Sequence, residues 1–327
     1  MTKVKLKQFI ESLGLTTYGF IPLRRFDELI SFYQMRKEKK LQNEFEEDEI
    51  EKRVNPLLYM QDGKTIISIA FPYRQQENIC SNGFSLYTKG KDYHKVVRKY
   101  LNQICEFLTQ NGYQAEAFVD SNALPERYIA YLSGVGFIGR NNMIITKQYG
   151  SFVFLGEIIT NLAIDCKDMR EVTEIASYAE CKECRICYGE CPTKSINEGK
   201  INPNICLSYY TQKKELSNQE IKLIRENVFG CDYCQLKCPY NKEVAQTGLE
   251  DFKQIKEMNE KIETYAGMDN KFFKEKISGS SCGWRGKNVL RRNAIIQLAK
   301  QGKEIEQYQG DSSYINEYIK RLKEMEH

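Results

Sequence analysis

Apolar side chains in the first 165 residues follow helical and strand-like periods in turn. They recur three or four positions apart over residues 4–13 and 96–108, and this spacing predicts two amphipathic helices. A third helix is expected over 125–133, where Pro125 would occupy the first turn. The chain is therefore expected to begin with an α+β domain. Strands are predicted over residues 65–71, 117–120, 143–146 and 152–160.

Charged residues dominate the segment 36–53, which contains RKEKK followed, after LQN, by EFEEDEIEKR. Charge runs of this kind are typical of the solvent-exposed face of a helix. We therefore expect these residues to form a solvated helix and to contribute little to the hydrophobic core.

The composition is that of a globular protein. Hydrophobic residues make up 41% and charged residues 28% of the 327 residues, which excludes a disordered chain. The 48 basic and 44 acidic residues leave a net charge of +4, which permits a nucleic-acid partner without requiring one. The charged residues 1–7 lead into an amphipathic pattern, and no segment approaches the roughly 20 apolar residues of a membrane helix. We expect a cytoplasmic protein without a signal peptide or membrane association.

Cysteines are concentrated in the middle of the chain. The sequence has 12 cysteines but only 2 histidines, and most of the cysteines lie within residues 166–250. A disulfide framework is not expected at this size without a signal peptide, and zinc sites that mix Cys with His are nearly excluded. Cysteine density therefore predicts three parts, namely residues 1–165, 166–250 and 251–327.

The middle part contains a run typical of bacterial ferredoxins. In two-cluster ferredoxins, three closely spaced cysteines bind one [4Fe–4S] cluster and a fourth, followed by proline, binds the other cluster. Residues 231–239 repeat the end of this pattern as Cys-x2-Cys-x3-Cys-Pro. This part is therefore predicted to be a ferredoxin-like domain with two clusters. The first run is Cys181-x2-Cys184-x2-Cys187-x3-Cys191-Pro192.

Eight thiolates would complete two clusters with crossed ligands. The second run lacks its first cysteine, because Val228 stands at that position, and the isolated Cys206 is the natural replacement. One cluster is predicted to be bound by Cys181, Cys184, Cys187 and Cys238. The other is predicted to be bound by Cys191, Cys206, Cys231 and Cys234.

Other cysteine chemistry fits this spacing less well. A pair of four-cysteine zinc sites would use the CxxC pairs, but zinc requires neither the third cysteine nor the Cys-Pro ending. A radical-SAM cluster needs CxxxCxxC, which neither run contains. The remaining cysteines are interpreted as ordinary thiols, namely Cys80, Cys105, Cys166 and Cys282.

The glycines of residues 134–139 (GVGFIG) match the pattern of a dinucleotide fingerprint. That fingerprint binds a dinucleotide only when it follows a strand and precedes a helix. Here the glycines follow the helix predicted at 125–133 and precede the strand predicted at 143–146. We therefore interpret them as a tight, closely packed connection and not as an NAD site.

Several separate motifs resemble those of epoxyqueuosine reductases, in the same order and over residues 1–300. Clusters alone make an electron carrier, but residues 1–165 are far more than a ferredoxin needs, so this part is expected to use the electrons for chemistry. The motifs are IEKRV at 50–54, GKDYH at 90–94, VDSNALPER at 119–127, GVGFIGRN at 134–141, GSFVFLGE at 150–157, GCDYCQ at 230–235, and WRGK at 284–287 with RNA at 292–294.

The resemblance implies a nitroreductase-like cobalamin-binding domain, then the two-cluster domain and a short helical C-terminal region. It implies reduction of epoxyqueuosine to queuosine in the tRNA anticodon loop, the last step of queuosine synthesis, by cob(I)alamin that receives electrons from the clusters. The sequence adds that no Asp-x-His-x-x-Gly motif is present, so a histidine ligand to cobalt is not expected. Longer family members continue into a C-terminal helical-repeat extension, and this chain is expected to be a short form without the full extension.

The resemblance also implies roles for individual residues. Asp120 matches the family's proton donor, and burial would have to keep it protonated near neutral pH; the alternative is that it caps the following turn. Arg53, Ser208 and Asp232 match positions that contact the corrin. His94 either borders the same pocket or is a structural histidine.

Basic residues near the end of the chain are candidates for tRNA contact. Arg285 and Lys287 lie beside Trp284, so this segment is expected to offer cations for phosphates and an aromatic ring for an unstacked base. The alternative is a solvated helix face. The same segment also contains Arg291, Arg292 and Lys300.

Three other functions remain open at this point. A cobalamin-dependent reductase of another substrate, similar to reductive dehalogenases, would usually carry a twin-arginine signal, which is not seen here. An electron-transfer iron–sulfur protein would not explain Asp120 or residues 1–165, and a zinc nucleic-acid-binding module would lack iron and cobalt. The expected partners are the tRNA anticodon stem-loop and an external electron donor such as flavodoxin or ferredoxin, and we expect a monomer.

Overall fold

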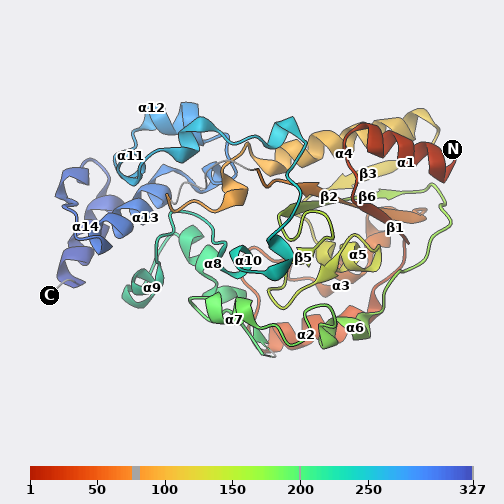
Figure 1. The fold of residues 1–327 in the computed structure, drawn as a ribbon, viewed down its shortest axis with the longest axis horizontal. Coiled ribbons are helices and arrows are strands. Elements are labelled where there is room, and N and C mark those ends of the chain that lie inside the picture. Colours follow the sequence, from red (N-terminus) through yellow and green to blue (C-terminus); the bar gives the residue numbers. More distant parts are fainter. Residues whose placement is uncertain (76–81, 199, 326–327) are drawn as a thin grey trace.

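The computed structural model describes residues 1–75, 82–198 and 200–325. A four-stranded antiparallel sheet, in the order β1-β2-β6-β3, lies in the N-terminal part (Figure 1). The strands predicted at 65–71 and 152–160 are confirmed, and they pair with each other. Cys80, interpreted as an ordinary thiol, lies outside the described residues. The strands are β1 (Tyr18–Pro22), β2 (Thr65–Pro72), β3 (Ala115–Phe118) and β6 (Val153–Thr160).

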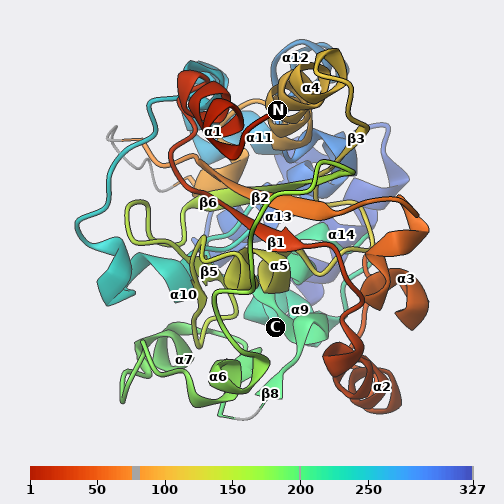
Figure 2. The same ribbon diagram turned by 90° about the vertical axis from the view of Figure 1, so that its right-hand side faces the viewer.

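Helices cover both faces of this sheet (Figures 1 and 2). α1 (Lys3–Ser12) and α4 (Tyr93–Gln110) pack on one face, and α5 (Glu126–Leu132) packs on the other. Every residue of β2 is buried, because its alternating side chains enter a hydrophobic cluster on each side. The three predicted helices are therefore confirmed, with ends that shift by about one turn at most.

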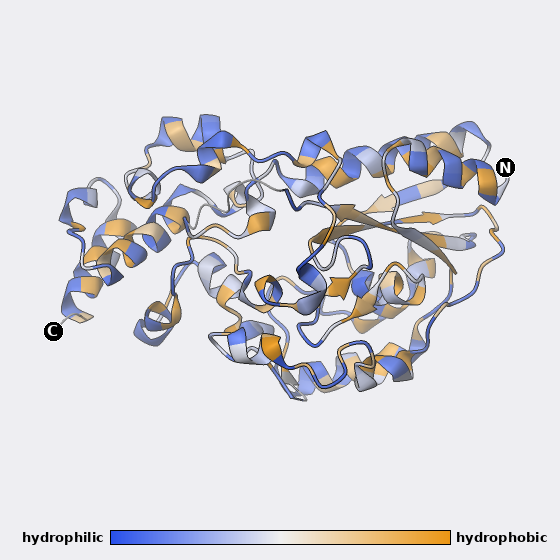
Figure 3. Ribbon diagram, in the orientation of Figure 1, coloured by the Kyte–Doolittle hydropathy of each residue, from blue (hydrophilic) through white to orange (hydrophobic). Residues whose placement is uncertain are grey.

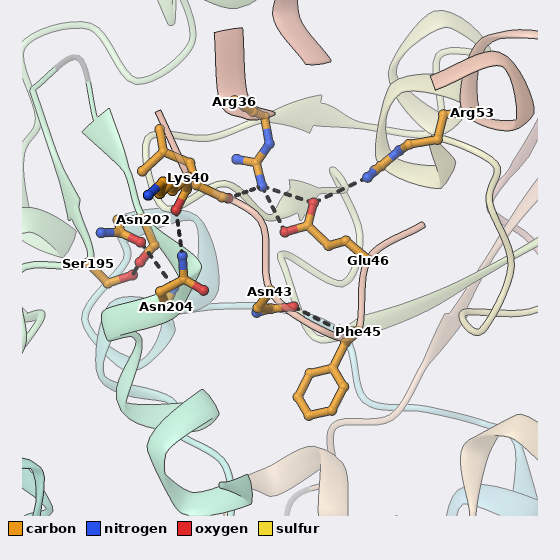
Figure 4. Close-up of polar contacts among 10 residues, drawn as sticks. Arg36, Lys40, Asn43, Phe45, Glu46, Arg53, Ser195, Asn202 and Asn204 are labelled. Atoms are coloured by element: carbon orange, nitrogen blue, oxygen red, sulfur yellow. Dashed lines mark hydrogen bonds and ion pairs between the residues drawn. The ribbon is translucent and has the colours of Figure 1, made fainter. Parts of the chain in front are cut away.

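The charged segment 36–53 does not form the predicted helix. α2 (Ile30–Glu38) ends near its start, α3 (Ile50–Val54) occupies its end, and a non-helical loop joins them. Arg36 is only 8% exposed, and its guanidinium donates to the Glu46 carboxylate at 2.8 Å (Figure 4). The expectation of a solvated helix was wrong because opposite charges in the same run pair with each other inside the fold.

The glycine-rich residues 134–139 form the tight connection that the sequence predicts. They link α5 to a small hairpin of β4 (Phe137–Ile138) and β5 (Ile144–Ile145), so the strand expected at 143–146 is present in short form. A Cβ atom at Gly136 would lie 2.6 Å from the Ile145 carbonyl oxygen, so a side chain at this position has no room. The segment is a packing element of the hairpin, as expected.

The cysteine-rich part is built from short helices and turns. α7 (Ile186–Glu190) lies within the first cysteine run and contacts α10 (Tyr233–Leu236) of the second run. This contact brings together two cysteine runs that are far apart in the sequence. The other elements of this part are α6 (Val172–Ser177), β7 (Ile196–Asn197), β8 (Lys200–Ile201), α8 (Leu207–Gln212) and α9 (Asn218–Leu223).

The C-terminal part is helical, as predicted. α13 (Lys287–Lys300) runs through its centre and is buried along most of its length, while α14 (Ser313–Met325) packs against it. In Figure 3, apolar and polar residues alternate along these two helices. The remaining helices are α11 (Ile262–Ala266) and α12 (Asn270–Phe272).

The hydrophobic clusters do not follow the three expected parts. Residues of α8 and of 221–229 pack in the same cluster as α13 and α14. Leu249 and Phe252 join the cluster beneath α1 and α4, and Cys181 and Cys238 pack against the one beneath α5. The division into 1–165, 166–250 and 251–327 therefore stays a prediction. Among the described residues, none of the helices has the length and apolarity needed to cross a bilayer.

Candidate active site

Asp120 lies two residues beyond β3, in a turn that directs its carboxylate toward the start of α4. Its backbone φ is +45°, in the left-handed region, which Asp tolerates better than most residues. Tyr93 Oη and His94 Nε2 lie 2.8 and 2.9 Å from its Oδ2 atom. The N-cap of α5 is Pro125, which has no side-chain cap, so Asp120 does not cap that helix. The alternative of a purely capping role is therefore not supported.

His94 is held between two carboxylates in the first turn of α4. Asp92 caps this helix by accepting from the His94 backbone N–H, and its Oδ1 atom also lies 2.8 Å from Nδ1 of the imidazole ring. The other ring nitrogen faces Asp120. The Tyr93 ring stacks between His94 and Phe154, with 4.1 Å between ring centres on each side. These contacts fix the imidazole beside Asp120.

The same contacts shift two pKa values in opposite directions. Desolvation lowers the pKa of His94, but the carboxylates of Asp120 and Asp92 outweigh it and raise this pKa to about 9. Partial desolvation raises the pKa of Asp120, but hydrogen bonds from His94 and Tyr93 outweigh it and hold this pKa below its ordinary value. The neighbouring donors thus favour the carboxylate of Asp120, and the expectation that burial against a corrin or an apolar surface keeps it protonated stays a prediction.

Tyr87 connects the surroundings of Asp120 to the cysteine-rich part. Its ring meets the Tyr93 ring edge to face, with 6.4 Å between centres. Burial above all, and then nearby Cys282 and the carboxylates of Asp232 and Asp120, raise the pKa of Tyr87, while neighbouring Ser208 opposes this shift. Three of the residues singled out in the sequence, namely Asp120, Ser208 and Asp232, thus lie around one tyrosine.

Asp232 is only 8% exposed and binds the segment at residues 85–86. Ser85 Oγ donates to its Oδ1 atom at 2.6 Å, and the Leu86 N–H donates to Oδ2 at 2.8 Å. Burial raises the pKa of Asp232, although these two hydrogen bonds oppose the shift. Both carboxylate oxygens already have protein donors, so contact between Asp232 and a corrin stays a prediction.

Arg53 lies on α3, which follows the charged loop, and Figure 4 shows it beside Glu46 of that loop. Its guanidinium carbon is 4.2 Å from the centre of the Tyr33 ring, and Nη1 donates to Glu46 Oε2 at 3.2 Å. The Glu46 carboxylate is shared with Arg36. The Nε atom of Arg53 is buried and has no hydrogen-bond partner among the described residues. A buried donor without an acceptor is an unusual feature that a bound ligand would explain.

The eight predicted cluster ligands fall into two sets of four. Burial raises the pKa of Cys187 to about 11, and the nearby thiols that contribute are Cys181, Cys238 and Cys184. Burial likewise raises the pKa of Cys234, and here the contributing thiols are Cys231, Cys206 and Cys191. Each Cys-Pro cysteine thus lies with thiols of the other run, which is the crossed grouping that the spacing predicts.

None of these thiols forms a disulfide. All eleven described cysteines are free. In the part of the chain that the structure describes, no three Cys, His, Asp or Glu side chains converge on the position of a single metal ion. Because clusters bind thiolates, loading must release the protons that burial holds on these sulfur atoms.

Comparison with known proteins gives this arrangement a family. A family model described as "Epoxyqueuosine reductase QueG, DUF1730" matches residues 53–121, and one described as "4Fe-4S double cluster binding domain" matches residues 180–241. The chain is 32% identical to the epoxyqueuosine reductase of Lactococcus garvieae (strain Lg2), over 90% of this chain and 86% of that protein. This chain belongs to the epoxyqueuosine reductase family. It is also 33% identical to the Bacillus subtilis (strain 168) enzyme, over 91% of this chain and 78% of that protein.

Solved epoxyqueuosine reductases have the same fold. One, crystallised with an epoxyqueuosine-modified tRNA-Tyr stem loop, matches with a TM-score of 0.87 and 30% identity, over 97% of this chain and 88% of that one. Another, from Bacillus subtilis with its catalytic aspartate loop swung out of the active site, matches with a TM-score of 0.80 and 31% identity, over 91% and 81%. The predicted α+β fold with a double-cluster domain is confirmed.

Arg292 of this epoxyqueuosine reductase family member is buried, so it cannot make the tRNA contact for which it was a candidate. Its side chain is 0% exposed and lies inside the C-terminal core. Nη1 donates to the carbonyl oxygens of Lys213 and Lys214 at 2.7 and 2.8 Å, and to the Tyr314 hydroxyl at 2.9 Å. The expectation was wrong because a long basic side chain inside a helix bundle can bind loop carbonyls as well as phosphates.

Arg291 and Lys300 also have partners within the protein. Arg291 donates to the carbonyl oxygens of Ala266 and Tyr308. Lys300 donates to the carbonyl oxygen of Lys222 at 2.9 Å, and desolvation lowers the pKa of both basic groups. Their charges serve the packing of the C-terminal part, which leaves Arg285 and Lys287 as the main candidates for tRNA contact.

Arg285 and Trp284 form an exposed aromatic and basic corner. The guanidinium carbon of Arg285 is 5.1 Å from the Trp284 ring centre, and its Nε donates to the Gln212 carbonyl oxygen. Trp284 is 55% exposed, and its ring meets that of Phe45, which is 48% exposed, at 5.8 Å. Phe45 belongs to the charged loop, so that loop meets the turn that precedes α13 at this corner.

Sequence reasoning assigned no role to Tyr93, Glu126 or Arg127. All three lie in motifs that resemble the family, so the signal was present in residues 90–94 and 119–127. Arg127 is exposed near the charged loop, and its Nη1 donates to the Asn142 carbonyl oxygen at 2.8 Å. Glu126 lies on the first turn of α5, and the nearby Asp120 of the preceding turn raises its pKa.

Proposed function

We propose that this chain reduces epoxyqueuosine in tRNA to queuosine, with Asp120 as the group that protonates the departing oxygen. The observation that supports this most directly is the position of Tyr87. Asp120, held by His94, lies near Tyr87, and so does Ser208, two residues after the predicted cluster ligand Cys206. A proton-handling group and an electron-carrying centre therefore meet around one tyrosine.

The residues present fit the cofactors of the family, cobalamin and two [4Fe–4S] clusters. The two sets of four thiols suit two cubanes. The unpartnered Nε of Arg53 is a donor for the amide carbonyls that surround a corrin, and we infer that Ser208, Asp232 and His94 lie along the same cofactor. When bound, cobalamin supplies a strongly reducing cobalt centre that accepts electrons from the clusters.

Loss of the epoxide oxygen consumes two electrons and two protons and gives an alkene and water. An alkoxide is a poor leaving group, so an acid has to protonate the oxygen as the bond breaks. Asp120 is positioned by Tyr93 and His94 to deliver this proton, and protonated His94 returns one to it. The pKa shifts of His94 and Asp120 keep that proton on the pair at neutral pH.

A tRNA stem-loop is the proposed macromolecular substrate. The structure of a relative with an epoxyqueuosine-modified stem loop supports this partner. Arg285 and Lys287 would contact phosphates, while the exposed rings of Trp284 and Phe45 would stack on an unpaired base. We also infer that the enzyme acts as a monomer in the cytoplasm, where tRNA is modified, with flavodoxin or ferredoxin as the electron donor.

Anaerobic reconstitution tests the proposal. The purified chain is loaded with iron, sulfide and cobalamin, reduced, and incubated with epoxyqueuosine-containing tRNA, after which the nucleosides are analysed. We expect about eight irons and one cobalt per chain and conversion of epoxyqueuosine to queuosine. An enzyme that takes up no corrin, or that is fully loaded and leaves epoxyqueuosine unchanged, would contradict it. An organohalide serves as the control substrate for a dehalogenase-like activity.

A further inference from the structure

Three buried polar side chains join the first part of the chain to the second cysteine run. Ser151 lies in the turn before β6, Gln235 lies on α10, and Asn241 follows the predicted cluster ligand Cys238 by three residues. Ser151, Gln235 and Asn241 are only 1%, 4% and 2% exposed. We call these three residues the Asn241 clamp. Buried polar groups that are fully hydrogen-bonded make the segments that they join rigid.

Hydrogen bonds connect each residue of the Asn241 clamp to the other two. Asn241 Oδ1 accepts from the Ser151 backbone N–H at 2.8 Å, and Asn241 Nδ2 donates to Ser151 Oγ at 2.8 Å. The same Nδ2 atom donates to the Gln235 carbonyl oxygen at 2.8 Å, and Ser151 Oγ donates to Gln235 Oε1 at 2.9 Å. Because a backbone N–H can only donate, it fixes which end of the Asn241 amide faces Ser151.

Gly150 makes this close approach possible. Its φ is +57°, in the left-handed region, and a Cβ atom there would lie 2.0 Å from Asn241 Oδ1 and 2.9 Å from the Tyr240 carbonyl oxygen. A side chain at this position would therefore push the Asn241 amide away from Ser151. The motif at 150–157 thus begins with two residues that together receive Asn241.

The Asn241 clamp holds a segment that carries one predicted ligand of each cluster. Cys234, which directly precedes Gln235, is predicted to bind one cluster, and Cys238 the other. The Cys238 N–H donates to the Gln235 carbonyl oxygen at 3.0 Å, and the Cys238 carbonyl oxygen accepts from the Asn241 N–H at 2.9 Å. The backbone of Cys238 is thus bonded to two clamp residues, so a shift of the clamp would move cysteines of both sets.

The first part of the chain holds this segment at further points. Arg74, which follows β2, donates from Nη1 to the Asn241 carbonyl oxygen at 2.6 Å. Asn141, between β4 and β5, donates from Nδ2 to the Cys234 carbonyl oxygen at 3.3 Å. Partners behind the ligands of a metal centre orient those ligands and control the access of water, and water access in turn affects the reduction potential.

We propose that Ser151 and Asn241 are positioning residues for both [4Fe–4S] clusters, through which the first part of the chain sets their reduction potentials. Both side chains act through the segment 234–238 and not as ligands. The clamp is closed to water, and dry surroundings make the added negative charge of a reduced cluster less stable. The inference concerns the iron–sulfur centres alone and applies to any substrate that receives the electrons.

Redox titration of the reconstituted holoprotein, followed by electron paramagnetic resonance without tRNA, tests the inference. Ser151→Ala removes the hydroxyl that links Asn241 to Gln235, although it lies far in the sequence from the predicted ligands. We expect about eight irons per chain and higher midpoint potentials for both clusters, because water gains access to the segment. Ser177→Ala is the matched control and should titrate as the wild type does, since this exposed hydroxyl donates to the Glu174 carbonyl oxygen within α6.

A double variant tests whether the clamp acts as one unit. Asn241→Ala already removes the side-chain bonds to Ser151, so adding Ser151→Ala should cause little further shift in the potentials. Fully additive shifts would overturn the inference. Loaded variants with wild-type potentials would also overturn it, even if they unfold more easily, because a merely structural role changes stability alone.

Two further outcomes have a defined meaning. Lower iron content in folded Ser151→Ala than in Ser177→Ala supports the inference, since partners behind the ligands contribute to metal affinity. A wild type whose clusters titrate normally but which leaves epoxyqueuosine unreduced would contradict the proposed function and leave the role of the Asn241 clamp to be decided by the potentials of its variants.

Discussion

Nε2 of His94 lies 2.9 Å from Oδ2 of Asp120, while Nδ1 of the same ring lies 2.8 Å from Oδ1 of Asp92. An imidazole between two carboxylates is stabilised in its protonated form. The arrangement depends on two backbone features, the Asp92 cap of α4 and the left-handed turn at Asp120. The protonated imidazole of His94 therefore lies one hydrogen bond away from Asp120, the group that we propose delivers the proton.

Replacing Asp120 by Asn should remove turnover and leave the cofactors in place. Asn keeps the size of the side chain but cannot transfer a proton, so we expect kcat to fall by about 10²- to 10⁴-fold. The visible spectra of the loaded variant, compared with its rate on epoxyqueuosine-containing tRNA, provide the measurement. Asp165→Asn, at an exposed site, is the control. A rate equal to that of the wild type would remove Asp120 from the mechanism.

Replacing His94 by Gln should flatten the pH dependence of stability. The pKa of His94 is raised from 6.5 to about 9, so its contribution is fully present below pH 6.5 and is lost as the pH rises through about 9. The wild type should therefore become less stable over that interval, whereas His94→Gln should not. Urea unfolding midpoints from pH 6 to about 10 measure this. If the unfolding midpoints of the two proteins changed with pH in the same way, the protonated imidazole of His94 would contribute nothing to stability.

Replacing Cys191 by Ser tests the crossed cluster ligands. Cys191 is close in sequence to Cys187 but lies with Cys206, Cys231 and Cys234. Cys191→Ser should thus perturb the same electron paramagnetic resonance signal as Cys231→Ser, while Cys238→Ser should perturb the other. Cys105→Ser, on α4 away from both sets, serves as the control. If Cys191→Ser and Cys187→Ser perturbed the same electron paramagnetic resonance signal, the crossed arrangement would be contradicted.

Replacing Lys287 by Ala should weaken tRNA binding in a salt-dependent manner. Loss of one phosphate contact is expected to reduce the slope of log Kd against log salt by about 1. Binding of a labelled anticodon stem-loop at several salt concentrations measures the effect. Lys64→Ala, an exposed lysine that precedes β2, should bind as the wild type does. Equal slopes for the Lys287 and Lys64 variants would argue against the proposed contact.

Replacing Arg292 by Leu should act on stability instead of on tRNA contact. The change leaves the carbonyl oxygens of Lys213 and Lys214 buried without their donor, which is expected to cost about 3 kcal/mol. Urea denaturation of the holoprotein measures the loss. A fully stable variant with impaired stem-loop binding would show that Arg292 reaches the tRNA after all.

Hydrophobic periodicity was sufficient to predict the framework around the site. The β-branched run 65–71 and the apolar spacing at 96–108 correspond to β2 and α4, because buried elements carry their burial pattern in the sequence. The crossed grouping of the cysteines also follows from spacing alone. These features depend on short-range patterns, and short-range patterns are what a single sequence records most directly.

Features that depend on long-range contacts were not predicted. Nothing near Arg292 in the sequence indicates that loop carbonyls at 213–214 will surround it. The pairing of Arg36 with Glu46 turned an expected surface helix into a structured loop. The lowered pKa of Asp120 depends on His94, which the fold brings to it from another element. In each case, the chemistry of a charged side chain is set by partners that are not its neighbours in the sequence.

The crossed grouping of the thiols also constrains how the protein acquires its inorganic centres during synthesis. The set that begins with Cys181 is completed by Cys238, and the other draws on both runs as well. With the predicted ligands, neither cubane could be completed before both cysteine runs have been synthesised. On this ligand assignment, cluster insertion follows translation of both runs, and we expect a truncated chain that ends between them to hold no intact cluster.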